Sequence, residues 1–141
     1  MKRKASARWQ GTAKEGGGTL STQSGVLNDT PYSFVARFGD GKGTNPEELV
    51  AAAHAGCFTM ALSFMLDGAG FTANALDSEA TLTMDQVNGN WTVTGIHLTT
   101  RGRVPGIDAA KFAEIASNAK ANCPISRLLN ATITLDAALV D

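Results

Sequence analysis

The chain has 141 residues, one domain's worth of sequence and enough to bury a substantial core, so we expect a single domain over residues 1–141. Hydrophobic residues make up 43% and charged residues 18%, a globular composition that excludes a disordered chain. The 12 basic and 13 acidic side chains give a net charge of −1, which argues against a nucleic-acid-binding surface because such a surface needs clustered positive charge.

Three strands are predicted in the first part of the chain. Residues 5–10 alternate in polarity, and residues 19–24 follow a turn at the three glycines 16–18. A third strand is expected to carry one apolar face made of Tyr32, Phe34, Ala36 and Phe38. The basic residues 1–4 are not followed by an apolar run, so we expect no export signal and a cytoplasmic location.

The clearest local signal is the segment 45–48, whose sequence is Asn-Pro-Glu-Glu. Asn45 is a good N-cap and Pro46 suits the first helical position, while the two glutamates place negative charge at the positive end of the helix dipole. The pattern predicts a long helix that runs to about Asp67 and is stopped by Gly68.

This helix is apolar nearly all round its circumference, so it is expected to be wrapped by other structure. One chain of this length has few elements that could wrap it, and a homodimer with two such helices packed inside two sheets would solve the problem. A membrane span is not expected, because residues 49–66 include a histidine, a cysteine and two hydroxyl residues, and a span needs about 20 cleanly apolar residues.

A β-hairpin is predicted next. Residues 78–87 alternate, and Asn88-Gly89 is a strong signal for a two-residue hairpin turn. The apolar register of the return strand changes at Gly95, which predicts a β-bulge there.

Two helices and a strand complete the chain. Asp108 caps a helix, Pro124 interrupts the chain, and a short second helix is expected over residues 125–129. The last strand is expected to carry one apolar face made of Ala131, Ile133, Leu135 and Ala137. The element order βββ-α-ββ-αα-β predicts an α+β fold.

The two cysteines are the first candidates for chemistry. Cys123 precedes Pro124 at a helix start, where free N–H groups and the helix dipole stabilise a thiolate, so it is either a reactive thiol or simply a small residue at that position. Cys57 lies in mid-helix, where burial raises a thiol pKa, and the local sequence supplies no cation. No zinc site is expected, because the chain has two cysteines, two histidines and no CxxC spacing.

His54 and the two glutamates each allow two interpretations. His54 lies one helical turn before Cys57, which suggests a Cys–His hydrolase, but a lone histidine on a buried helix is more often a hydrogen-bonded core residue. Glu48, at the third helical position, is placed to reach back to the cap residue, which leaves Glu47 free for other work.

Three segments then form a specific pattern: TNPEEL at residues 44–49, AAHAGCF at 52–58 and ANCPIS at 121–126. In this order and spacing they resemble the OsmC/Ohr family. SGVLN at 24–28 and VPGID at 104–108 resemble the OsmC branch in particular. The resemblance covers essentially the whole chain.

The resemblance implies a thiol-dependent peroxidase that prefers organic hydroperoxides. It implies an intertwined homodimer in which two long central helices are enclosed by two β-sheets. Cys57 matches the peroxide-attacking cysteine and Cys123 the resolving cysteine, while Arg37 and Glu47 match the residues that support the thiolate. No cofactor is implied beyond an external dithiol reductant, either dihydrolipoamide or a lipoylated protein.

The resemblance reverses the local ranking of the cysteines, because the Arg37 guanidinium would favour an ionised Cys57. Glu47 and Cys57 are ten residues apart on one helix, about 15 Å along its axis. We therefore hypothesise a composite site in which Arg37 and Glu47 of one subunit face Cys57 of the other. Two rivals remain: a redox sensor that oxidises once, and the Cys57–His54 hydrolase, which lacks an evident oxyanion-hole loop.

Overall fold

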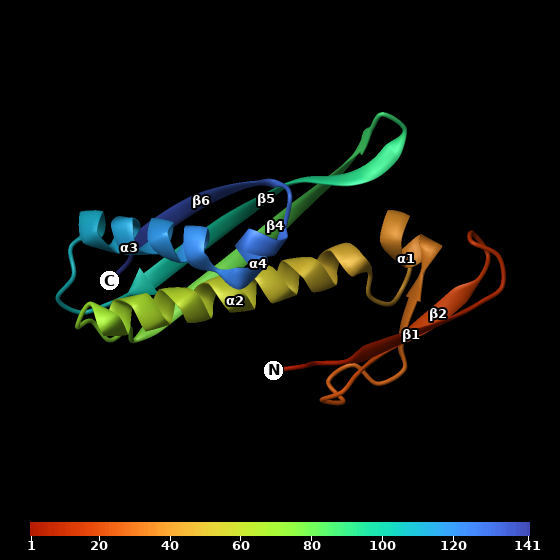
Figure 1. Cartoon of the computed structure of the whole chain (residues 1–141), viewed down its shortest axis with the longest axis horizontal. Helices are drawn as coiled ribbons and strands as arrows, with labels where there is room; N and C mark the ends of the chain where they lie inside the picture. Colours follow the sequence, from red (N-terminus) through yellow and green to blue (C-terminus); the bar gives the residue numbers. More distant parts are fainter. The chain divides into compact units, whose positions relative to one another are not determined.

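A computed structural model describes all 141 residues, which form two compact units, Met1–Leu49 and Val50–Asp141. Each unit contains one three-stranded sheet, and the chain is mixed α+β as the sequence predicts (Figure 1). The expectation of a single domain stays a prediction.

The first unit is an antiparallel sheet followed by a short helix. Its strands β1 (Ala5–Gln10), β2 (Gly17–Thr22) and β3 (Thr30–Ser33) pair in the order β1-β2-β3. The helix α1 (Phe34–Phe38) follows β3 directly. All three predicted strands exist, although β2 begins within the glycine run that the sequence assigned to a turn.

The predicted third strand is wrong beyond Ser33, where the chain turns into α1. The Ser33 hydroxyl accepts a hydrogen bond from the Ala36 N–H at 3.1 Å, which is an N-cap. The rings of Phe34 and Phe38 lie 4.7 Å apart, one helical turn from each other. Local capping therefore prevails over the alternating pattern, and it places Arg37 in the last turn of a helix.

The second unit begins with most of α2 (Pro46–Gly68) and continues through β4 (Ala75–Val87), β5 (Asn90–Arg103), α3 (Ala109–Asn122), α4 (Pro124–Leu128) and β6 (Thr132–Leu139). The sheet order is β4-β5-β6, with β4 antiparallel and β6 parallel to β5. The alternating burial of β6 confirms the apolar face predicted for the last strand.

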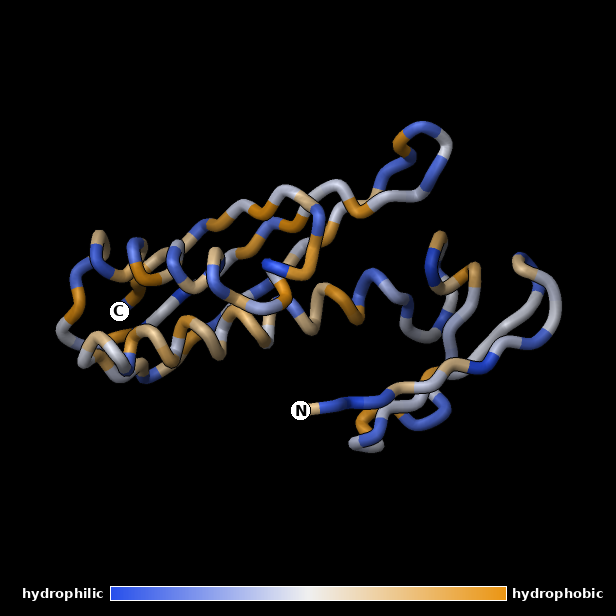
Figure 2. The backbone as a smooth tube through the Cα atoms, viewed as in Figure 1, coloured by the Kyte–Doolittle hydropathy of each residue, from blue (hydrophilic) through white to orange (hydrophobic).

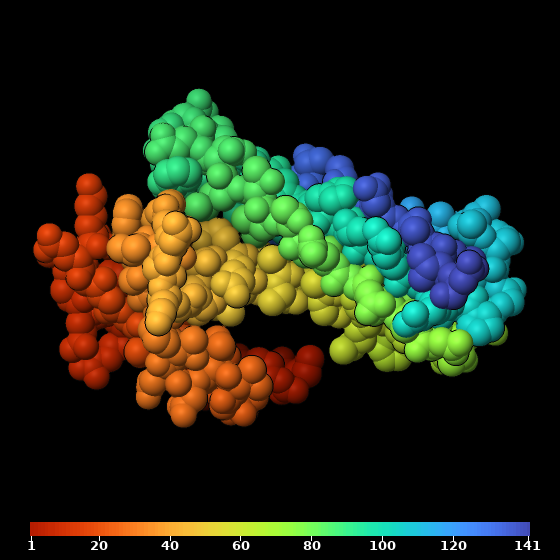
Figure 3. Space-filling model, turned by 180° about the vertical axis from the view of Figure 1, so that it is seen from behind, coloured from red at the N-terminus to blue at the C-terminus, as the bar shows by residue number.

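The hairpin between β4 and β5 confirms both local predictions. Asn88 and Gly89 have φ values of 52° and 79°, as the predicted two-residue turn requires. Thr83 pairs with Gly95 and Met84 with Val93, so one extra residue on β5 forms the bulge next to Gly95. Figure 3 shows the tip of this hairpin standing out from the rest of the second unit.

The ends of α2 follow from local chemistry. The Asn45 side-chain oxygen accepts a hydrogen bond from the Glu48 N–H at 2.8 Å, which confirms the predicted N-cap. At the other end, Gly70 has a φ of 85°, its N–H bonds to Asp67 O, and the Phe71 N–H bonds to Leu66 O. This is a Schellman motif in which Gly70 is the left-handed residue, and α2 ends at Gly68, within one residue of the predicted end.

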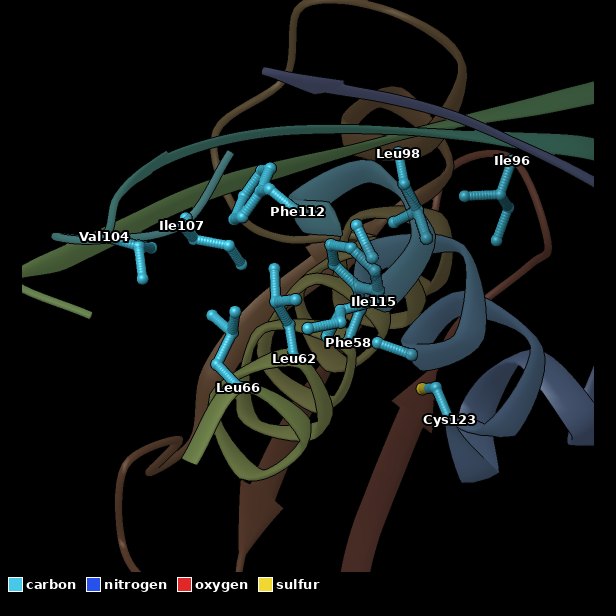
Figure 4. Packing of buried hydrophobic residues seen from close by; sticks show 12 residues of the cluster. Phe58, Leu62, Leu66, Ile96, Leu98, Val104, Ile107, Phe112, Ile115 and Cys123 are labelled. Carbon is cyan, nitrogen blue, oxygen red and sulfur yellow. The ribbon is translucent and has the colours of Figure 1, made fainter. Parts of the chain in front are cut away.

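The core of the second unit lies where α2, α3 and one face of the sheet meet. Figure 4 shows the side chains of the three elements converging. The central residues are Phe58, Leu62 and Leu66 from α2, Ile96 and Leu98 from β5, and Phe112, Ile115, Ala116 and Ala119 from α3. The α2 residues recur every four positions, so that helix contributes a single stripe to the core.

Helix α2 is not wrapped on all sides within one chain. Its buried residues are His54, Phe58, Leu62 and Leu66, whereas Met60 is 63% exposed and Phe64 is 73% exposed. Figure 2 shows apolar residues continuing along the helix. By length and composition α2 could cross a membrane, a test that core helices of soluble proteins also pass. The sequence expectation of a fully enclosed helix is therefore not met by a single chain.

One glycine is required by the core. A Cβ added at Gly102 would lie 2.6 Å from the ring of Phe112, which is fully buried. We expect Gly102→Ala to lower the free energy of unfolding by about 1–3 kcal/mol through overpacking. Denaturant unfolding measures this change. Gly17→Ala is the matched control, because a Cβ there meets nothing within 4 Å, and an equal loss in both variants would contradict the packing argument.

Candidate active site

The fold brings the two cysteines together from positions 66 residues apart. Cys57 is half-buried in α2, and Cys123 is completely buried between α3 and α4. The Cys123 thiol donates a hydrogen bond to the Cys57 sulfur, with 2.8 Å between the two Sγ atoms, and both residues are free thiols. Only a small movement separates this pair from the geometry of a disulfide.

Pro124 sets the backbone conformation of Cys123 and places it between α3 and α4. The residue before a proline is disfavoured in helical conformation, and Cys123 leaves the helix at φ −56° and ψ 125°. It therefore ends α3, with its N–H bonded to Ala119 O, and at the same time caps the start of α4, in which Pro124 is the first residue. Since proline has no N–H, the first free donor of α4 belongs to Ile125.

That donor acts on Cys57. Burial is the largest influence on the Cys57 thiol and raises its pKa, as does the neighbouring Cys123 thiol. The backbone N–H of Ile125 is directed at the Cys57 sulfur and lowers the pKa in part. Cys123 itself makes no side-chain capping bond to α4. The free donor at the start of α4 is therefore directed at Cys57, the cysteine for which the local sequence supplied no stabilising group.

His54 pairs with Ser126 and not with a cysteine. His54 Nε2 and Ser126 Oγ lie 2.8 Å apart, and both residues are buried. The other ring nitrogen, Nδ1, is buried without a hydrogen-bond partner. Burial also lowers the pKa of His54. The histidine therefore matches a hydrogen-bonded core residue, and the geometry does not support a Cys57–His54 hydrolase.

Arg37 and Glu47 form an ion pair in the first unit. Arg37 Nη2 lies 2.6 Å from Glu47 Oε1, and Arg37 Nε lies 3.1 Å from both carboxylate oxygens. The guanidinium carbon also lies 5.2 Å from the centre of the Phe38 ring. A carboxylate that engages two nitrogens of an arginine fixes the orientation of the guanidinium. Of the two neighbouring glutamates, Glu47 is the one bonded to Arg37.

The four predicted site residues thus form two pairs, Cys57 with Cys123 in the second unit and Arg37 with Glu47 in the first. No group of three or more His, Cys, Asp or Glu side chains could hold a metal ion.

Two contacts of the site were not predicted from the sequence. The Ile125 N–H on Cys57 and the Ser126 hydroxyl on His54 both join α4 to α2. The free N–H could have been anticipated from Pro124 at the helix start, but its target could not. Nothing in the sequence signals the His54–Ser126 pair, which is 72 residues apart.

Comparison with known proteins places this arrangement in a family. A family model described as OsmC-like protein matches residues 39–138. Peroxiredoxin OsmC of Escherichia coli (strain K12) is 53% identical over 137 residues, which cover 97% of this chain and 96% of that protein.

Solved structures of OsmC and Ohr proteins have the same fold as this chain. The organic hydroperoxide resistance protein OhrB of Bacillus subtilis is similar with a TM-score of 0.77 at 26% identity, covering 97% of this chain and 98% of that one. An OsmC-like protein of unknown function from Vibrio cholerae has the same fold, with a TM-score of 0.78 at 14% identity over 97% of this chain and 99% of that one. The chain therefore belongs to the OsmC family.

Proposed function

We propose that the chain is a thiol peroxidase that reduces organic hydroperoxides, and hydrogen peroxide less efficiently, to alcohols and water. The observation that carries the proposal is the 2.8 Å approach of Cys57 and Cys123 in a chain 53% identical to a peroxiredoxin. Two free thiols at that distance suit an enzyme that stores two oxidising equivalents as a disulfide and is then reduced.

The exposure of the two sulfurs supports Cys57 as the peroxide-attacking residue. Cys57 is half-buried and Cys123 completely buried, so a peroxide reaches Cys57 first. The Ile125 N–H also favours the charged form of Cys57, which is the nucleophile. Cys123, whose thiol already points at Cys57, is the resolving residue.

The proposed cycle has three steps. The Cys57 thiolate attacks the outer oxygen of the hydroperoxide and becomes a sulfenic acid, while the O–O bond breaks and the alkoxide takes a proton to leave as the alcohol. The Cys123 thiol condenses with the sulfenic acid, forming the Cys57–Cys123 disulfide and releasing water. An external dithiol then reduces this disulfide by exchange and becomes a disulfide itself.

Arg37 and Glu47 complete the site from the partner subunit in this proposal. Burial raises the Cys57 pKa, so the thiolate needs a cation nearby. Glu47 orients the Arg37 guanidinium, but Glu47 lies ten residues before Cys57 on α2, about 15 Å along the helix axis. A second copy of the chain can present its Arg37 to Cys57, where it would also bond the breaking peroxide.

The exposed side of α2 supports the homodimer. Met60 and Phe64 present large apolar surfaces to solvent, and a shallow groove beside them is lined by Gly56, Ser63 and Leu76. Exposed apolar surface of this kind marks an interaction site. Two α2 helices packed along these faces, each covered by sheet, would give the intertwined dimer that the sequence suggested.

The proposed reductant is dihydrolipoamide or a lipoylated protein, acting in the cytoplasm, where thiols are kept reduced. The test is steady-state peroxide consumption with such a dithiol, comparing cumene hydroperoxide with hydrogen peroxide. We expect many turnovers per subunit and a higher kcat/KM for cumene hydroperoxide. Loss of one equivalent of peroxide without further turnover would instead indicate a redox sensor.

A further inference from the structure

A buried hydrogen bond in the second unit joins α2 to α4 and takes no part in the proposed cycle. It is the 2.8 Å contact between His54 Nε2 and Ser126 Oγ, and both residues are buried. A buried polar group is costly unless it keeps its partner, so separating these side chains without water would be unfavourable. The bond therefore fixes the two elements that carry it.

The imidazole of His54 is neutral and carries its proton on Nε2, as two observations indicate. Burial lowers its pKa, so the ring is neutral near neutral pH. Its Nδ1 is buried without a partner. An orphaned buried N–H is rarer than an orphaned acceptor, so the proton belongs on Nε2, which donates to the Ser126 oxygen.

The same turn of α4 carries the donor that reaches Cys57. Ile125, directly before Ser126, directs its backbone N–H at the Cys57 sulfur, and the Cys123 thiol, at the start of the same helix, lies 2.8 Å from that sulfur. His54 lies one helical turn before Cys57 on α2. The two helices are thus joined at two neighbouring points. Helix α4 has five residues, too few to keep a helical turn in place by its own hydrogen bonds.

We infer that the His54–Ser126 bond is a positioning contact, which holds the first turn of α4 against α2 and so keeps the Ile125 N–H on the Cys57 sulfur. This inference rests on the proposed function in taking Cys57 as the attacking thiol. A role in stability alone would change the unfolding transition. A positioning role changes how readily Cys57 ionises.

Alkylation of Cys57 as a function of pH tests the inference without using peroxide. The Cys123→Ala background leaves Cys57 as the single thiol, because the chain has two cysteines. We expect Ser126→Ala to react with iodoacetamide roughly five- to tenfold more slowly at neutral pH, since a donor to a charged group is displaced. The rate profile should move to higher pH, and Ser126→Thr, which keeps the hydroxyl, should restore it.

His54→Leu removes the same bond from the other side and fills the buried position with an apolar side chain, so it should reproduce the Ser126→Ala profile. The double variant should add no further change. The matched control is Ser117→Ala, which removes an exposed hydroxyl from α3. Circular dichroism checks that each variant folds, and if Ser126→Ala does not, His54→Leu decides the matter.

Alkylation profiles of the Ser126 and His54 variants that coincide with the Ser117→Ala profile would overturn the inference. The outcome is separable from that of the proposed function. A wild-type protein that consumes no peroxide would refute the peroxidase proposal, whereas a displaced alkylation profile in the variants would still support the positioning contact.

Discussion

Replacing Cys57 with serine is expected to lower peroxide turnover by roughly a thousandfold or more, as removal of the nucleophile does in other covalent enzymes. Serine keeps the size of the side chain, but its hydroxyl does not ionise near neutral pH and cannot form the sulfenic acid. Steady-state consumption of cumene hydroperoxide with a dithiol donor measures the loss. The apolar core around Phe58 and Leu62 is untouched, so the unfolding transition should change little.

The variant Cys123→Ser separates the first reaction with peroxide from the formation of the disulfide. With Cys57 present and the proposed resolving residue absent, one equivalent of hydroperoxide should be consumed per subunit. Turnover should then stall with a sulfenic acid on Cys57, which a dimedone adduct detected by mass spectrometry would reveal. If Cys57→Ser kept wild-type turnover, or if Cys123→Ser failed to consume the first equivalent, the roles of the two cysteines would be misassigned.

The second large expected effect is recovery of activity when two inactive variants are combined in one dimer. In the proposed homodimer, Arg37→Ala and Cys57→Ser should each be nearly inactive, since the first lacks the proposed cation and the second the proposed nucleophile. Unfolded together in equal amounts and refolded, they should regain about a quarter of wild-type activity. About half of the dimers would then be mixed, and each mixed dimer would contain one intact composite site.

The pattern of recovery distinguishes a composite site from one built within a single chain. If Arg37 served the Cys57 of its own chain, the mixed dimer would contain no intact site and activity would stay at the level of the parents. A mixture of Arg37→Ala with Glu47→Ala is the control. Both changes disable the same ion pair, so neither subunit can supply an intact one and no recovery is expected.

The sequence predicts a structural feature well when that feature is set by interactions between neighbouring residues. The N-cap at Asn45 and the hairpin at Asn88-Gly89 are set by neighbouring residues, and both are confirmed. The cap at Ser33 is equally local, but the alternating aromatic residues after it favour a strand, so the pattern predicts a strand where α1 forms.

The site required contacts that no local pattern specifies. Pro124 indicated a helix start with free donors, yet the donor of Ile125 acts on Cys57, which lies far away in sequence. The Cys57–Cys123 approach follows from α2 and α3 sharing one core, which is a property of the whole second unit. Local patterns marked the two cysteines as candidates, but only the resemblance to a family assigned their roles.

The complete burial of Cys123 determines which sulfur of the disulfide the external dithiol attacks in the proposed cycle. Thiol–disulfide exchange requires the incoming sulfur to approach one sulfur of the disulfide and to push the other away. With Cys123 enclosed, the dithiol must attack Cys57, so the transient mixed disulfide forms on Cys57 and Cys123 departs as the leaving thiolate. The sulfur that meets the oxidant is then also the one that meets the reductant, and both substrates have to use the same opening in turn.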